Sequence, residues 1–130
     1  MRTARPDGLV RWHDSGQRVW FALEHDTGTE PLPRLHAKLA GYRELAMTNR
    51  PVLVLFWLHS RTRETNFHRL LHTRGSASYL ATASRDYSTE LGTSPAGALW
   101  RTPGSDTRRH LADLPAPTPG RQVLRQAGRP

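Results

Sequence analysis

Residues 18–42 of this chain read RVWFALEHDTGTEPLPRLHAKLAGY, and this stretch contains the features that decide the fold. Its first part, residues 18–26, is mostly apolar and bulky and ends in Asp-Thr-Gly, which predicts a β-strand followed by a turn. Side chains alternate between the two faces of a strand, so Glu24 and Asp26 are expected on one face and His25 on the other. Two carboxylates are therefore expected side by side at the end of a strand that otherwise belongs to the core.

A helix over residues 30–48 is predicted directly after this strand. Thr27 and Glu30 have the spacing of a capping box, and the proline that follows suits a first helical turn. Apolar residues then recur at helical spacing and define one buried stripe, which consists of Leu32, Leu35, Leu39, Tyr42 and Ala46. Lys38 and Tyr42 are four residues apart, so they are neighbours at the edge of that stripe. Strand carboxylates that face a helical lysine and tyrosine predict a hydrolytic site.

The composition limits the class of protein. The chain has 130 residues, which is the usual size of one domain, and 36% of them are hydrophobic. Its formal net charge of +8 favours an anionic partner, nucleic acid first, although 18 arginines against one lysine also fit a GC-rich genome. The absence of cysteine excludes disulfides and thiolate metal sites. Without a signal peptide or an apolar run long enough to cross a membrane, the chain is expected to be cytoplasmic.

Apolar runs and turn residues predict the remaining elements. The run PVLVLFWLH is continuously apolar, as in a central strand covered on both faces. Arg74 and Gly75 are expected to terminate the second helix, because glycine is favourable just after a helix C-terminus. A loop or one short helix is expected over residues 85–97. The further strands are expected at residues 8–13, 51–59, 79–83 and 98–101, and the second helix at residues 61–73, with Phe67, Leu70 and Leu71 on its inner side.

The resulting order β–β–α–β–α–β predicts an α/β or α+β fold, with a mixed sheet flanked by helices. The domain is expected to span residues 1–104 and to be followed by a disordered, basic tail rich in proline and glycine, residues 105–130. No predicted helix covers the sheet face near the first hairpin. Two explanations are open: an N-terminal DNA-binding domain is missing, or the chain forms a homodimer that covers this face.

Three carboxylates are expected to converge at the first hairpin. The start of one strand of an antiparallel pair lies beside the end of the other, so Asp7 is expected next to Glu24 and Asp26. A cluster of oxygen ligands suits Mg²⁺ or Mn²⁺, which polarises a phosphodiester and lowers the pKa of a bound water. The alternative is that Asp7 and Asp26 cap turns while Glu24 pairs with an arginine.

This arrangement resembles the PD-(D/E)XK nuclease superfamily, whose signature is a Pro-Asp followed by an acid-x-Lys on the next strand. The corresponding residues are Pro6-Asp7 and the acid-His-acid sequence at 24–26. The block RPDG…WFALEHDTGTE…RLHAKLAGYREL is more narrowly similar to the nuclease-like domain of actinobacterial replication-relaxation proteins, which are linked to plasmid replication and DNA relaxation. The resemblance covers residues 5–60 and continues more weakly to 104. It implies a restriction-endonuclease-like core that cleaves or nicks plasmid DNA.

The resemblance also assigns residues to the site. Asp7 and Glu24 match the two metal ligands, whereas Asp26 stands where the superfamily has lysine. Two outcomes are open: Lys38 reaches the site from the helix and Asp26 becomes a further metal ligand, or the site is inactive and leaves a DNA-binding scaffold. Residues 38–42 are similar to the Gln-x-x-x-Tyr element of RecB-like nucleases. The catalytic residues implied are Asp7, Glu24, Asp26, Lys38 and Tyr42, of which the first three are the metal ligands.

A basic face is expected on the second helix as the contact with the DNA backbone, formed by Arg61, Arg63, Arg69 and Arg74, with Arg85 close behind. An ordinary solvated helix face is the alternative. His68 and His72 have the i, i+4 spacing of a zinc-binding pair. No glutamate lies between them, as a metalloprotease would require, so they are expected to be surface histidines.

Overall fold

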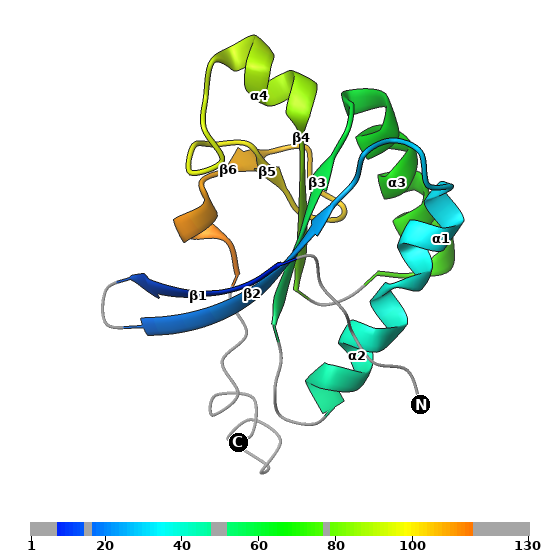
Figure 1. Ribbon diagram of the computed structural model, residues 1–130, viewed down its shortest axis with the longest axis horizontal. Coiled ribbons are helices and arrows are strands. Elements are labelled where there is room, and N and C mark those ends of the chain that lie inside the picture. Colours follow the sequence, from blue (N-terminus) through cyan, green and yellow to red (C-terminus); the bar gives the residue numbers. More distant parts are fainter. Residues whose placement is uncertain (1–7, 15–16, 48–51, 77–78, 116–130) are drawn as a thin grey trace.

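The computed structural model describes residues 8–14, 17–47, 52–76 and 79–115. Within these residues, six strands form one mixed sheet in which the spatial order follows the chain order, β1-β2-β3-β4-β5-β6 (Figure 1). The strands are β1 (Gly8–Asp14), β2 (Gln17–His25), β3 (Leu53–Leu58), β4 (Leu80–Ser84), β5 (Trp100–Arg101) and β6 (Arg108–Arg109). The helices are α1 (Leu32–Ala37), α2 (Leu39–Met47), α3 (Arg61–Arg74) and α4 (Arg85–Leu91), followed by the 3₁₀ helix η1 (Leu111–Asp113). The expected class, helices packed on a mixed sheet, is confirmed.

The strand directions follow from the connections. β1 and β2 form the predicted antiparallel hairpin, with Asp14 opposite Gln17 and Gly8 opposite Leu23. β2, β3 and β4 are parallel, because α1 and α2 connect the first two and α3 connects the second two. β5 and β6 continue the sheet in antiparallel pairing. The carboxyl ends of the three parallel strands therefore lie at one edge of the sheet.

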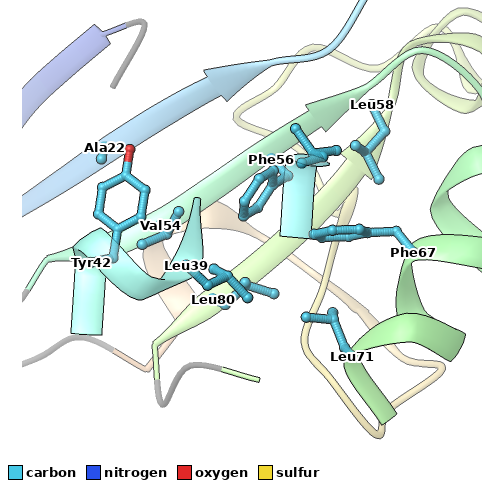
Figure 2. Packing of buried hydrophobic residues seen from close by; sticks show 10 residues of the cluster. Ala22, Leu39, Tyr42, Val54, Phe56, Leu58, Phe67, Leu71 and Leu80 are labelled. Atoms are coloured by element: carbon cyan, nitrogen blue, oxygen red, sulfur yellow. The ribbon is translucent and has the colours of Figure 1, made fainter. Parts of the chain in front are cut away.

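Helices α1, α2 and α3 lie together on one side of the sheet (Figure 1). The core on this side consists of Ala22, Leu35, Leu39, Tyr42, Val54, Phe56, Leu58, Phe67, Leu71 and Leu80 (Figure 2). The opposite core consists of Phe21, Leu53, Leu55, Ala81, Ala83, Leu99, Trp100 and Leu114. β3 contributes to both cores, as its continuous apolar run predicts, and only Trp57 on this strand is half-buried.

The predicted helix over residues 30–48 is divided into α1 and α2 by a turn at Lys38. The expected capping box is wrong: α1 begins after Pro31 without a side-chain cap, and the hydroxyl of Thr27 instead lies 3.1 Å from that of Thr29. α3 begins at Arg61, as predicted, and the Ser60 hydroxyl caps it by accepting the backbone N–H of Arg63 at 3.1 Å. Its expected end at the glycine of position 75 is confirmed as well.

The C-terminal part agrees with the prediction up to β5. Of the two alternatives for residues 85–97, the short helix is present as α4, and β5 lies within the strand expected at residues 98–101. The strand β6 and the 3₁₀ helix η1 were not predicted, so the order is longer than β–β–α–β–α–β, and the restriction-endonuclease-like order is not confirmed. Residues 105–115, expected to begin a disordered tail, contain β6 and η1, and Leu114 is buried in the second core. Residues 116–130 lie outside the described residues. None of the described helices has the length and apolar character needed to cross a membrane.

Candidate functional site around Glu24

Glu24 lies near the carboxyl end of β2, and only 1% of it is exposed. The Tyr42 hydroxyl donates a short hydrogen bond to its Oε2, and the Lys38 ammonium donates to its Oε1 at 3.3 Å. Figure 2 shows the Tyr42 ring directed from α2 toward β2. The structure thus brings together one strand carboxylate, the tyrosine of α2 and the lysine of the turn before α2. We call these three residues the Glu24 site.

Lys38 contacts a second carboxylate. Its Nζ is 3.3 Å from Oε1 of Glu30, the same distance that separates it from Oε1 of Glu24. Burial alone would lower the pKa of Lys38, but the charge and hydrogen bond of Glu24 and the weaker contribution of Glu30 outweigh it and raise the pKa above its ordinary value. Because 37% of the lysine side chain is exposed, this ammonium is the part of the site that solvent reaches.

Asp26 lies on the same face as Glu24 but has a separate set of partners. The Arg63 guanidinium binds it with two hydrogen bonds of 2.7 and 2.8 Å, and the backbone N–H groups of Gly28 and His59 donate to it at 3.0 and 3.2 Å. Burial would raise the pKa of Asp26, but these four bonds and the charge of Arg63 hold it below its ordinary value. Asp26 therefore fastens the end of β2 to β3 and α3.

Gly28, in the turn after β2, packs closely against His59, the residue that follows β3. Gly28 has φ = 91°, and a Cβ atom at this position would lie 2.9 Å from the His59 ring. Glycine is required here because both the backbone conformation and the available space exclude a side chain. This packing keeps Asp26 within reach of the His59 N–H group.

The donor atoms of Glu24 fit a hard divalent ion, because they are carboxylate oxygens and the place beside Oε1 already accepts a cation, the Lys38 ammonium. Asp26 fits less well, since both of its oxygens accept bonds from Arg63 and the backbone. The described residues contain no group of three or more His, Asp or Glu side chains that could hold a metal. Asp7, the third expected ligand, lies outside the described residues.

The expected DNA-binding arginines do not share one environment. Arg63 is committed to Asp26 and also donates to the Glu30 carbonyl at 2.8 Å. Arg61 forms an ion pair of 2.8 Å with Glu90 and lies over the Tyr87 ring. Among the five arginines that were expected to bind DNA, Arg69, Arg74 and Arg85 are exposed and form no ion pair with a described acid. Arg74 ends α3, near the start of β4, whereas Arg85 follows the end of β4.

A third buried carboxylate, beside those of Glu24 and Asp26, belongs to α3 and was not predicted from the sequence. Glu64 is 1% exposed and accepts two hydrogen bonds of 2.7 Å from the Arg108 guanidinium of β6. The Thr82 hydroxyl donates to it at 2.5 Å, and His68 Nε2 lies 2.7 Å from the same hydroxyl. Since the single hydrogen of Thr82 goes to Glu64, the histidine Nε2–H is the donor in the last contact. We call these residues the Glu64 network.

The prediction that His68 is a surface histidine is therefore wrong, because this side chain is buried. Burial, together with the nearby charges of Arg101 and Arg108, lowers the pKa of His68 to about 4, although Glu64 and Asp106 act in the opposite direction. The ring is neutral near pH 7. A signal for this network was present in the sequence, because residues 64, 67, 68 and 71 share one side of a helix and Phe67 and Leu71 were expected on the inner side.

Comparison with known proteins concerns the N-terminal part of the chain. Residues 1–52 match the family model described as Replication-relaxation. The replication-relaxation match contains the whole Glu24 site and ends before β3. The Glu64 network, formed by α3, β4 and β6, lies outside it. No curated protein and no solved structure matches the chain.

Proposed function

We propose that the chain is a nuclease-like, DNA-processing module of the replication-relaxation type, in which the Glu24 site acts on DNA phosphodiesters. The observation that carries this proposal is the convergence of Lys38 and Tyr42 on one buried carboxylate, within the segment that matches the family. A carboxylate, an ammonium group and a phenol in contact are groups that can bind and orient a phosphate ester. The net charge of +8 favours an anionic polymer as the partner.

Each residue of the Glu24 site has a proposed role. Lys38, exposed at 37%, would donate to a non-bridging phosphate oxygen. Tyr42 would hold the Glu24 carboxylate in one orientation, because its hydroxyl already binds Oε2. Glu24 would hold a divalent ion together with Asp7. This pairing is proposed because Gly8, the residue after Asp7, lies opposite Leu23, the residue before Glu24. When bound, Mg²⁺ or Mn²⁺ would supply a polarised phosphodiester and an activated water.

A second candidate function is DNA binding without cleavage on the same nuclease-like scaffold. The observation that favours it is the Asp26–Arg63 pair, because Asp26 occupies the position at which the PD-(D/E)XK resemblance places a lysine. A carboxylate fixed by a guanidinium contributes structure but no mobile cation at this position. In this case Lys38 and the exposed arginines Arg69, Arg74 and Arg85 would bind the phosphate backbone.

One experiment separates the two candidates. Supercoiled plasmid is incubated with the wild-type chain in Mg²⁺ or Mn²⁺, beside the Glu24→Gln variant, and binding of the same DNA is measured in EDTA. The first candidate predicts nicking that requires the ion and is lost in Glu24→Gln, with DNA binding retained. The second predicts equal binding by both proteins with no nicking, and a steep dependence of the binding constant on salt. Absence of both activities at moderate salt would contradict both candidates and leave an interaction domain whose charge reflects base composition.

A further inference from the structure

Glu30 contacts the ammonium group of the Glu24 site. It lies in the connection between β2 and α1, outside the expected site, yet its Oε1 is as close to the Lys38 ammonium as that of Glu24. Within the described residues, Lys38 is the ion-pair partner of this carboxylate. The ammonium is therefore shared between two acids, one on its buried side and one nearer to solvent.

The two acids differ in how firmly they are held. Glu24 is 1% exposed and is also bound by the Tyr42 hydroxyl, so it cannot turn away without breaking two contacts. Glu30 is 30% exposed. An ion pair open to solvent contributes only about 0–1 kcal/mol, so the Glu30 side of the ammonium is the side that an incoming anion can take.

We propose that the Glu30 carboxylate is an internal substitute for a nucleic-acid phosphate: it occupies the solvent side of the Lys38 ammonium and is displaced when a DNA phosphate binds there. A carboxylate oxygen and a phosphate oxygen make the same charge-assisted bond to an ammonium group, so they compete for it. The backbone of Glu30 stays in place because its carbonyl accepts a bond of 2.8 Å from Arg63. Only the side chain has to rotate away, which makes Glu30 a tethered competitor. The inference rests on the proposed binding of DNA.

The test is the affinity for a short fluorescent DNA duplex, measured in EDTA at physiological ionic strength for the full chain. The variants are Glu30→Gln, Lys38→Met, the combination of both, and Glu44→Gln as the matched control. Glu44 lies half-buried on α2, is not a partner of Lys38, and its substitution changes the net charge by the same amount. We expect Glu30→Gln to lower the Kd about threefold, the gain that corresponds to removing a solvent-exposed ion pair, and to exceed the effect of Glu44→Gln.

The double variant decides whether the gain acts through Lys38. If Glu30 competes with phosphate for the ammonium, the gain from Glu30→Gln falls to the level of the control once Lys38 is methionine. A gain that persists in the Lys38→Met background, or one no larger than that of Glu44→Gln, would overturn the inference while leaving DNA binding intact. If the wild-type chain and all variants fail to bind DNA, the proposed function is overturned together with it.

Discussion

The Glu24 site and the Glu64 network contain carboxylates that are equally buried but differently compensated. Both glutamates are 1% exposed and lie between the sheet and its helical layer. Glu24 is in register with Phe56 and, one strand further, with Thr82 of the Glu64 network, so the two sites lie at one level of the sheet. Phe56 packs against Phe67 between them, with 4.9 Å between ring centroids.

The difference lies in the cation. Arg108 binds both oxygens of Glu64 in a planar fork, also donates to the Leu99 carbonyl, and lies over the Tyr87 ring. Lys38 contacts one oxygen of Glu24 through a longer bond and is 37% exposed. A guanidinium fixed in this way closes its site, whereas an ammonium on a flexible stem can exchange partners. We infer that the Glu64 network is structural and that the Glu24 site is the one able to take a ligand.

The largest effect is expected from breaking the closed site. Arg108→Met leaves Glu64 buried without its cation, which should lower the free energy of unfolding by about 3 kcal/mol in urea titrations. Arg109→Met is the control, because Arg109 is exposed on the same strand and its replacement should change stability by less than about 0.5 kcal/mol. Equal stabilities for the two variants would contradict the structural role of the Glu64 network.

The second effect concerns pH. The unfolded chain protonates His68 near its ordinary pKa of 6.5, whereas burial lowers the pKa of the folded state to about 4. The unfolded state therefore binds more protons between these values, so stability should fall as the pH falls through this window, by about 2–3 kcal/mol from this residue. Unfolding measured from pH 7 to 4 should show a shallower slope for His68→Gln. His72→Gln, an exposed histidine on the same helix, should keep the wild-type slope.

A smaller effect is expected when the Glu24 site loses its phenol. Tyr42→Phe removes the donor to Oε2 of a buried carboxylate, at a cost of about 1–2 kcal/mol in unfolding free energy. The same substitution in a Glu24→Gln background should cost less, because the oxygen that remains is neutral. Costs that are equal in the two backgrounds would show that Tyr42 acts by packing alone.

The smallest change in stability is expected for Lys38→Met. Because the lysine is half-exposed, water can replace it beside Oε1, and the free energy of unfolding should fall by only about 1 kcal/mol. Removal of a cation would then destabilise the Glu24 site much less than the Glu64 network. A loss as large as that of Arg108→Met would mean that the two sites are equally closed, and would remove the distinction between them.

Local patterns predicted a large part of this structure. The alternation along residues 18–26 predicted that Glu24 and Asp26 share one face, and the four-residue spacing of Lys38 and Tyr42 predicted that these two are neighbours facing the strand carboxylates. The structure shows that both contact Glu24. The hairpin followed from apolar runs and turn residues, and the central strand β3 from its continuous apolar run. These features depend on contacts between neighbouring elements, which spacing in the sequence can describe.

Long-range partners could not be predicted in this way. Thr27 and Glu30 have capping-box spacing, but Glu30 pairs with Lys38 instead. Asp26 binds an arginine 37 positions away, and Glu64 binds one 44 positions away in a segment expected to be a disordered tail. Nothing in local periodicity identifies which of 18 arginines will meet a buried acid. Only the three-dimensional structure therefore distinguishes the arginines that bind buried acids from those that are exposed.

The most direct test of the account is nicking of supercoiled plasmid in Mg²⁺ by the Lys38→Met variant, with Arg109→Met as a control of equal net charge. If the Glu24 site acts on phosphodiesters through Lys38, the rate should fall on the order of a hundredfold in Lys38→Met and remain near the wild-type rate in Arg109→Met. Circular dichroism and urea unfolding establish that both variants are folded. Nicking by Lys38→Met at the rate of Arg109→Met, or no nicking by the wild-type chain, would contradict the proposed role of the Glu24 site.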